Sequence, residues 1–354
     1  VIADLTLDDL QSMRIDPADY TLRVGPGSKT TLTYRAWGKF SDGSEKDITS
    51  QVEFQLSTAR VGNFSDNVFY PAISWGGGTT VYANTTTGMK ATTSLTVVYS
   101  RAYKGAGIPN SVESDFTKGA ATKGIPLQLA YPPDGVLLPP NLMELEVQWL
   151  PGAGQTYFQI SFTNVGTDIR VYTTCATKIG SGCGYTLSET EWKSVVGALK
   201  GYEAAKVMVR GADTAFSSVG ESNARDMSVA EEDIMGGLYY WNATPGNIIR
   251  YDFGKANQKA KLFYSAGDAK ALFCVGCHAL SLDGSRMAVG MDMPAPAPLK
   301  VIDVSSKATL SKGAANFMAF SPDGKLMIAS DGNSMSLHDS DTLAVVKKPL
   351  RASG

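Results

Sequence analysis

Two cysteines and a histidine stand together in the run Cys274-Val275-Gly276-Cys277-His278. This spacing is the attachment pattern for c-type haem: the two thiols add across the haem vinyl groups, and the histidine that follows ligates the iron. The chain has only 4 Cys and 2 His among 354 residues, so chance would produce roughly 0.0003 such runs. We therefore expect one covalent haem c on Cys274 and Cys277, with His278 as the proximal ligand.

Other chemistries use the same residue types and stay open at this point. The two thiols could close a small disulfide loop instead. A zinc site would need two further ligands, and the remaining cysteines lie about 90 residues away. A thioredoxin-like redox site would need a βαβ setting that this sequence lacks.

The sixth iron ligand has four candidates. His338 is the only other histidine, and it reads equally well as a polar residue at a strand end. Met287, Met291 and Met293 lie closer to the motif, although methionines in strands more often fill a core. A His–Met pair would raise the reduction potential relative to two histidines, whereas an open sixth position would allow ligand binding or peroxidase-like chemistry.

The second cysteine pair, Cys175 and Cys183, is eight positions apart. We expect a disulfide here, with two free thiols as the alternative. Paired cysteines in a chain of short strands are more typical of an oxidising compartment than of the cytosol. The sequence therefore favours an exported protein that is periplasmic, outer-membrane-associated or extracellular.

We assign no catalytic residue. The chain contains no nucleophile elbow, phosphate-binding loop or zinc-protease motif. Its carboxylates, such as Asp42, Asp283 and Asp323, fall in turns, where aspartate caps the backbone. The segment Ser330–Ser334 could bind calcium, but a plain turn explains it as well. The residues favour electron transfer or binding over enzymatic catalysis.

Composition narrows the class of protein further. The 32 Lys+Arg nearly balance the 34 Asp+Glu, giving a formal charge of −2. The sequence has no block of basic residues, which argues against nucleic acid as a partner. No apolar run is long enough to span a bilayer. Abundant Gly, Thr, Val and Tyr favour strands and turns, and the length predicts about two to four domains. We expect an all-β chain.

Residues 1–100 alternate apolar and polar side chains in short runs separated by Gly- and Asp-rich turns, which predicts a β-sandwich. The run "LRVGPGSKTTLTYRAWGKFSDGSEKDITSQVEFQLS", followed by "VFYPAISWGGGTTVYA" and "ATTSLTVVY", resembles bacterial Ig-like domains of the Big family over about residues 5 to 99. That resemblance implies a spacer or adhesion module outside the cell.

Residues 101–124 are rich in Gly, Ser and Lys and read as a linker. Residues 125–235 form a second unit of alternating strands, one carrying Trp149. Its architecture resembles a fibronectin type III or Ig-like sandwich. Residues 189–199 have apolar side chains at helical spacing, and Ser188 with Glu191 forms a capping box. We expect one short helix here.

Residues 236–354 contain a repeat. "SLDGSRMAVG" at 281–290 returns as "SPDGKLMIAS" at 321–330, and "VIDVSSKATL" at 301–310 returns as "LHDSDTLAVV" at 337–346. A period near 40 with four strands indicates propeller blades. The repeats resemble TolB-type and WD40-like propellers, and "CVGCHALSLDG" resembles TolB-type propellers that carry one haem attachment site. We count two full blades and one lacking its inner strand, so we expect an incomplete propeller whose open edge is covered either by further chain or by a partner chain.

Together these features predict two β-sandwich domains followed by a partial β-propeller with a covalent haem site. The expected function is electron transfer by an exported monohaem c-type cytochrome-like protein, with a redox partner protein or a larger assembly. One alternative is a non-redox extracellular binding or scaffold protein in which the haem is structural or absent. Another is a haem peroxidase or oxidase with an open iron site.

Overall fold

The computed structural model describes residues 6–120, 122–255, 260–292, 297–332 and 334–351. The chain is mostly β and divides into two compact units, Val1–Ile234 and Met235–Gly354. The boundary lies one residue before the predicted one. Among the described residues, no helix is both long and apolar enough to cross a bilayer.

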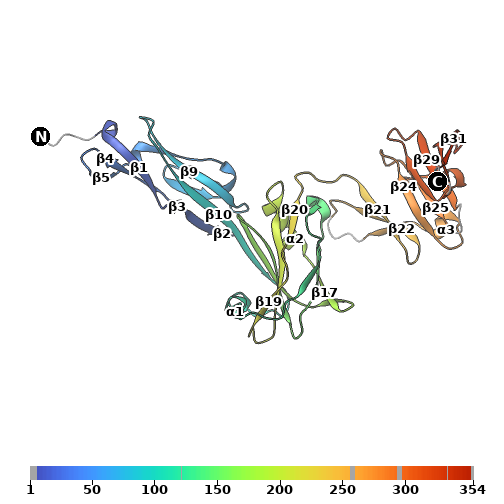
Figure 1. The fold of residues 1–354 in the computed structure, drawn as a ribbon, viewed down its shortest axis with the longest axis horizontal. Helices are drawn as coiled ribbons and strands as arrows, with labels where there is room; N and C mark the ends of the chain where they lie inside the picture. The colour runs from blue at the N-terminus through green and yellow to red at the C-terminus, as the bar shows by residue number, and fades with distance from the viewer. Residues whose placement is uncertain (1–5, 121, 256–259, 293–296, 333, 352–354) are drawn as a thin grey trace. The chain divides into compact units, whose positions relative to one another are not determined.

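One large sheet runs through the whole of the first unit (Figure 1). Its order is β12 (Val136–Leu138), β20 (Arg225–Val229), β18 (Ala205–Ala212), β14 (Tyr157–Asn164), β15 (Thr167–Thr174), β10 (Lys90–Lys104), β9 (Gly77–Thr85) and β6 (Val52–Leu56), with β19 (Val219–Glu221) on β18 and β2 (Tyr20–Val24) on β10. Strand β10 is long enough to pair with β9 in its first part and with β15 in its last part. It therefore joins the two halves of the unit.

Two small sheets complete the first half. They are β1 (Leu10–Asp16), β4 (Arg35–Phe40) and β5 (Glu45–Asp47), and β3 (Leu32–Thr33), β8 (Val68–Pro71) and β7 (Gly62–Ser65). The core between the layers contains Tyr34, Phe69 and Leu95, all fully buried. In the first part of β10, Lys90 to Leu95, exposed and buried side chains alternate, as a strand with one face in a core requires.

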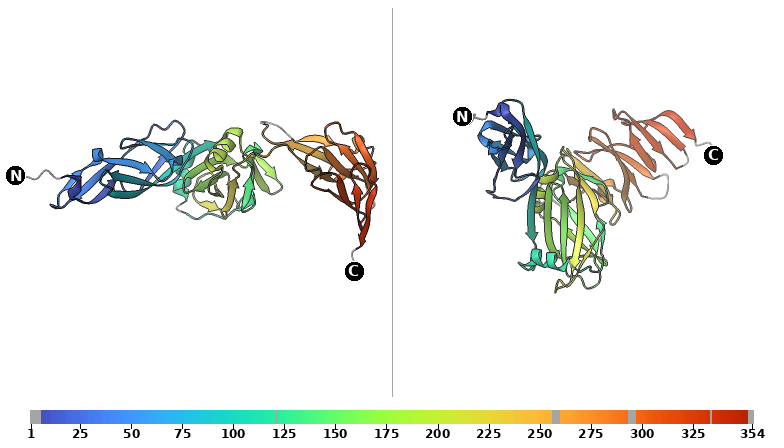
Figure 2. Two further views of the ribbon diagram at one scale, coloured as in Figure 1. Left: turned by 90° about the horizontal axis from the view of Figure 1, so that it is seen from above. Right: turned by 60° about the vertical axis from the view of Figure 1, so that its left-hand side comes forward.

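In the second half of the unit, green to yellow in Figure 2, both faces of the large sheet are covered by other elements. One cover is the sheet β11 (Gln128–Tyr131), β13 (Glu146–Leu150), β17 (Gly182–Thr186) and β16 (Thr177–Ile179), together with helix α2 (Glu189–Leu199). Helix α2 has the predicted bounds, and the capping box of Ser188 and Glu191 is present. Short 3₁₀ helices occupy Leu7–Asp9, Thr49–Gln51, Ala59–Val61 and Pro140–Leu142.

The structure corrects the predicted linker at 101–124. Its first residues continue β10 as far as Lys104, and helix α1 (Val112–Gly119) follows. Val112, Phe116 and Gly119 are buried at spacings of four and three, so one side of α1 packs on the large sheet against Tyr172. The segment is structured because this apolar side has a sheet face to cover.

The second unit consists of three consecutive antiparallel meanders, each paired in sequence order. The first meander is β21 (Gly237–Asn242), β22 (Asn247–Asp252) and β23 (Lys261–Tyr264); the second is β24 (Val275–Leu280), β25 (Arg286–Met291), β26 (Pro298–Asp303) and β27 (Thr309–Ala314); the third is β28 (Phe317–Phe320), β29 (Leu326–Ser330), β30 (Ser334–Asp339) and β31 (Val345–Arg351). A single turn of helix, α3 (Ala266–Ala269), connects the first two. The arrangement is propeller-like.

The second meander is sandwiched between the other two. Met287, Val289 and Ile302 pack toward Ile248 of the first meander. On its opposite face, Ala288, Leu299 and Val301 pack toward Met327 and Ala329 of the third. Successive residues of β25 thus face different neighbours, as strand geometry requires.

The repeated turn uses the same chemistry twice. In the second meander the Ser281 hydroxyl donates to Asp283 at 2.6 Å and accepts from the amide of Arg286. In the third, the Ser321 hydroxyl donates to Asp323 at 2.6 Å and accepts from the amide of Leu326. The Ser-x-Asp-Gly sequence therefore encodes a side-chain-capped hairpin turn.

Candidate functional site

A β-bulge lies between the two cysteines of the Cys-x-x-Cys run, since Cys274 directly precedes β24 and Cys277 lies within it. Residues three apart in a regular strand face opposite sides. Here Val275 pairs with Met291 but His278 pairs with Val289, so three steps on β24 oppose two on β25. The extra residue interrupts the alternation of side chains that a regular strand would have between Val275 and His278.

Both cysteines line one cavity of about 340 Å³. Its lining comes from all three meanders of the second unit and is mainly apolar: Trp241, Cys274, Gly276, Cys277, Gly290, Met291, Asp292, Ala297, Asn316 and Phe317. Side chains are absent or minimal at Gly276, Gly290 and Ala297. A Cβ added at Gly276 would lie 3.6 Å from the indole of Trp241, so this wall is formed by backbone and one aromatic ring.

His278 lines an adjoining cavity of about 350 Å³, which shares Trp241, Gly276, Cys277 and Phe317 with the first. Its Nδ1 lies 3.0 Å from the carbonyl oxygen of Gly276. Its Nε2 has only a long contact, 3.5 Å, to the carbonyl oxygen of Tyr239. When Nδ1 carries the proton and donates to Gly276, Nε2 keeps the lone pair that a metal ligand needs.

Asp292 holds the loop that carries Cys274. Its carboxylate accepts hydrogen bonds from the amides of Leu272, Phe273 and Cys274 at 2.7 to 3.1 Å. Its own amide donates to the carbonyl oxygen of Cys274 at 3.1 Å. The amides of Leu272 and Phe273 hold the pKa of the Asp292 carboxyl below its ordinary value. Asp292 is thus a positioning residue for Cys274.

The predicted sixth-ligand candidates occupy different places. Met291 lines the cavity with the two thiols, whereas Met287 is fully buried in the core between the first two meanders. Met293 lies outside the described residues. The structure adds one candidate that the sequence did not single out: Met318 lines the second cavity together with His278.

His338 is not brought to this site. It lies on β30 and lines a separate cavity between the second and third meanders. Its Nδ1 is 2.8 Å from the carbonyl oxygen of Leu343, and its Nε2 is 2.7 Å from the Ser336 hydroxyl. Both ring nitrogens are therefore engaged locally.

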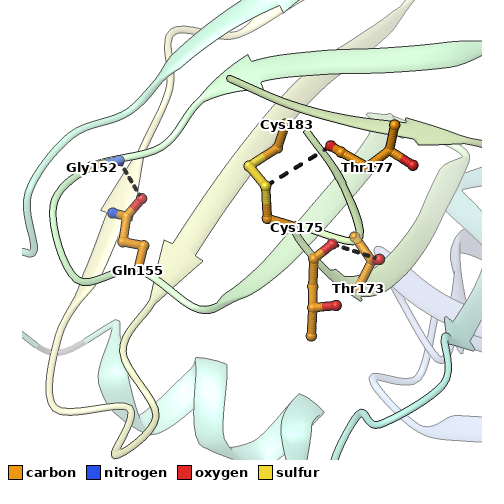
Figure 3. The surroundings of a disulfide bond; sticks show 7 residues. Gly152, Gln155, Thr173, Cys175, Thr177 and Cys183 are labelled. Carbon is orange, nitrogen blue, oxygen red and sulfur yellow. Dashed lines mark hydrogen bonds between the residues drawn. A yellow bond between two sulfur atoms is a disulfide. The ribbon is translucent and has the colours of Figure 1, made fainter. Parts of the chain in front are cut away.

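The cysteine pair of the first unit forms the predicted disulfide (Figure 3). The Cα atoms of Cys175 and Cys183 are 5.2 Å apart, inside the limit of about 7 Å that a bridge allows. Cys183 is buried on β17 opposite Trp149, and Cys175 directly follows β15. The bridge thus ties the small sheet to the large one.

Calcium at Ser330–Ser334 stays a prediction, and the described residues of this segment form a capped turn. The Asp331 carboxylate accepts hydrogen bonds from the amide and the hydroxyl of Ser334, which is turn capping. Across the described parts of the chain, no three His, Cys, Asp or Glu side chains gather closely enough to hold a metal ion. A haem site differs in this respect, because the macrocycle supplies four of the iron ligands itself.

Comparison with known proteins leaves the family open. No family model matches the chain, and no curated protein matches it. Among solved structures, the Dos1 propeller is 11% identical over 99% of this chain and 78% of that one, with a TM-score of 0.24. TolB from Acinetobacter baumannii is 10% identical over 88% and 74%, with a TM-score of 0.20. Similarities this low do not bear on function.

A third similar structure is SGBP-B of the Bacteroides ovatus mixed-linkage glucan utilization locus, solved with a mixed-linkage heptasaccharide. It is 10% identical over 94% of this chain and 71% of that one, with a TM-score of 0.22. The inference about function therefore rests on the residues of the site.

Proposed function

We propose that this protein is an exported, c-type cytochrome-like electron-transfer protein with one haem bound covalently to Cys274 and Cys277. The observation that carries the proposal is that Cys274 and Cys277 both line one mainly apolar cavity, beside a bulge in β24. Thiols at this spacing on a regular strand would diverge. Neither a disulfide loop nor a pair of free thiols requires a shared apolar cavity formed by three meanders.

The residues around the thiols fit a flat apolar macrocycle. Gly276 and Gly290 leave the wall beside the thiols without side chains, and Trp241 and Phe317 offer aromatic faces at the cavity. Apolar surroundings are one of the means by which a protein sets a haem potential, together with the axial ligands. His278 is the proximal ligand in this proposal, with its Nδ1–H fixed on the carbonyl oxygen of Gly276.

A haem bound here would supply a one-electron iron couple. The chain offers methionine sulfur at both cavities, Met291 beside the thiols and Met318 beside His278. A thioether ligand would favour electron transfer over chemistry at an open iron position. A single haem passes its electron to another centre, so the proposal includes a redox partner protein or a larger assembly.

The disulfide of Cys175 and Cys183 supports an oxidising compartment, where c-type haem attachment also belongs. We assign the first half of the first unit to a Big-like sandwich and the second half to a fibronectin III-like sandwich. Both would act as spacers for the meander unit, which we assign to a partial propeller.

The test is haem retention in a pair of matched double variants. The protein is produced in cells that perform c-type haem maturation, and covalent haem is measured by the pyridine haemochrome spectrum after acid–acetone extraction. Wild type and C175S/C183S, the control that removes the other two thiols, should both retain haem. C274S/C277S should retain none; retention there, or absence of haem in wild type, would overturn the proposal.

A further inference from the structure

A polar cavity of about 260 Å³ lies in the first unit, just beyond the point where β2 ends on β10. Strands β2, β10 and β15 and helix α1 all contribute to its lining, which includes Arg23, Ser100, Ala102, Asp168 and Arg170. The cavity shares no residue with the two cavities at the Cys-x-x-Cys run. Binding here is therefore independent of haem.

The carboxylate of Asp168 holds two arginines at this cavity. Asp168 is 8% exposed. It accepts hydrogen bonds from Nε and Nη2 of Arg170 at 2.7 and 3.1 Å, and from Nη1 of Arg23 at 2.9 Å. Burial raises the pKa of Asp168, but the hydrogen bonds from Arg170 and Arg23 outweigh it and keep the pKa below its ordinary value. One negative charge thus faces two positive charges.

The charge of the cavity lining is positive overall. Three arginines line it, against the two carboxylates of Asp168 and Glu113, and Glu113 already forms an ion pair with Lys104 at 3.1 Å. Both oxygens of Asp168 are occupied by guanidinium donors. A concave site with surplus positive charge attracts anions.

Arg23 keeps its best donors for a ligand. Among the described residues only its Nη1 has a partner, and its side chain is 61% exposed. The neighbouring donors Nε and Nη2 form the fork that grips both oxygens of a carboxylate or phosphate. The same two nitrogens of Arg170 hold Asp168, and those of Arg14 hold Glu45. The fork of Arg23 is set up for the same task.

A main-chain amide faces the same cavity. Two backbone bonds fix which residues of β10 face β15, because the amides of Tyr99 and Gly105 both donate on that side. A parallel ladder uses alternate residues, so the amide of Ala102 points to the opposite edge of β10. On that edge the pairing with β2 ends at Tyr99. The Ala102 amide has no backbone partner in the described parts of the chain.

We propose that this cavity binds an oxyanion, a phosphate or sulfate group carried on a polar molecule of about the size of a sugar. The fork of Arg23 takes two of the oxygens and the amide of Ala102 a third, while Asp168 acts as a positioning residue for the two arginines. A cavity of about 260 Å³ is close to the lower limit for pockets that hold small molecules, which leaves room beside the anion for the group that carries it.

Titration of the full-length protein at low ionic strength tests the proposal. Wild type should bind glucose 6-phosphate saturably in calorimetry, with shifts of the Ala102 and Arg23 amide signals in NMR spectra. Glucose, the uncharged probe, should not bind. Inorganic phosphate lacks the contacts of the sugar, so it should bind at least ~10-fold more weakly than glucose 6-phosphate.

Variants of Arg23 test the role of the fork. R23Q should raise the dissociation constant for glucose 6-phosphate at least ~10-fold, since it removes charge-assisted hydrogen bonds. R23K keeps the charge but not the fork and should also bind more weakly than wild type. R14Q is the matched control, because Arg14 is a similarly exposed arginine of the same unit, paired with Glu45, and it should bind like wild type.

Circular dichroism establishes that the variants are folded. The proposal is overturned if wild type shows no saturable binding, if R23Q or R23K binds as tightly as wild type, or if R14Q weakens binding as much as R23Q. It is also overturned if inorganic phosphate binds as tightly as glucose 6-phosphate, since the cavity would then hold a free ion only.

Discussion

Breaking the disulfide between Cys175 and Cys183 should cost the first unit a calculable part of its stability. The two residues are eight positions apart. In the chain-entropy description, closing a loop of this length destabilises the unfolded state by about 2.5 kcal/mol at 25 °C. Reduction should therefore lower the free energy of unfolding by about that amount.

Removing the sulfur atoms should cost more than reducing the bond. Cys183 is 1% exposed and belongs to the core that contains Trp149 and Trp192. C175A/C183A loses this packing in addition to the cross-link, and deletion of one buried heavy atom adds about 1 kcal/mol. We therefore expect the double variant to be about 3.5 kcal/mol less stable than the oxidised wild type.

Urea unfolding followed by tryptophan fluorescence measures both values, with and without dithiothreitol. The reductant should leave C175A/C183A unchanged, which separates this bond from the thiols of Cys274 and Cys277. A loss below 1 kcal/mol on reduction of wild type, with the bond shown to be open, would refute the entropic reasoning. An effect of dithiothreitol on the double variant would show that other cysteines contribute.

Three further changes test other parts of the structure. In protein produced without haem, Asp292→Ala should speed alkylation of the Cys274 thiol several-fold, because three loop amides lose their acceptor; an unchanged rate would remove Asp292 from its positioning role. Ser281→Ala should raise the pKa of Asp283 from about 2 toward 3.8, because the Ser281 hydroxyl is the main cause of the lowering. A carboxyl whose pKa is lower in the folded state than in the unfolded chain stabilises the fold at pH values above the unfolded-state pKa, and this stabilisation is lost as the pH falls toward 2. The variant should therefore lose less stability than wild type between pH 4 and pH 2. Carboxyl NMR titration measures the pKa, and acid unfolding measures the stability. Phe116→Ala should cost about 3 to 4 kcal/mol, because its ring is fully buried against Tyr172 and Phe216; a loss under 1 kcal/mol in urea unfolding would mean that α1 contributes little to the unit.

The features that sequence reasoning predicted well are those encoded locally. Helix α2 has the predicted bounds because helical spacing and a capping box coincide at Ser188 and Glu191. The hairpin turns at Ser281 and Ser321 share one hydrogen-bond pattern because the repeat preserves their Ser-x-Asp-Gly sequence. The disulfide was predictable because its two cysteines lie close in the chain.

Helix α1 was missed although a signal was present. Val112, Phe116 and Gly119 have helical spacing, but the segment is short and surrounded by Gly and Ser, so its composition suggested a linker. Its stability comes from Tyr172 and Phe216, which lie 56 and 100 positions further along the chain. A single sequence does not reveal such tertiary packing.

The motif at the candidate site was visible in the sequence, but its surroundings were not. Asp292 acts on Cys274 from 18 positions away, and its partners are backbone amides, which leave no mark on residue type. Trp241 and Phe317 reach the cavity from neighbouring meanders. A bulge in the pairing of β24 with β25 lies between Cys274 and Cys277, and this register is a property of the sheet.

The intact mass of the purified protein tests the central claim most directly. Produced in cells competent for c-type haem maturation, the chain should carry the added mass of one haem, and fragments with the modification should contain both Cys274 and Cys277. A chain with no added mass, with both thiols free or joined to each other, would contradict the account.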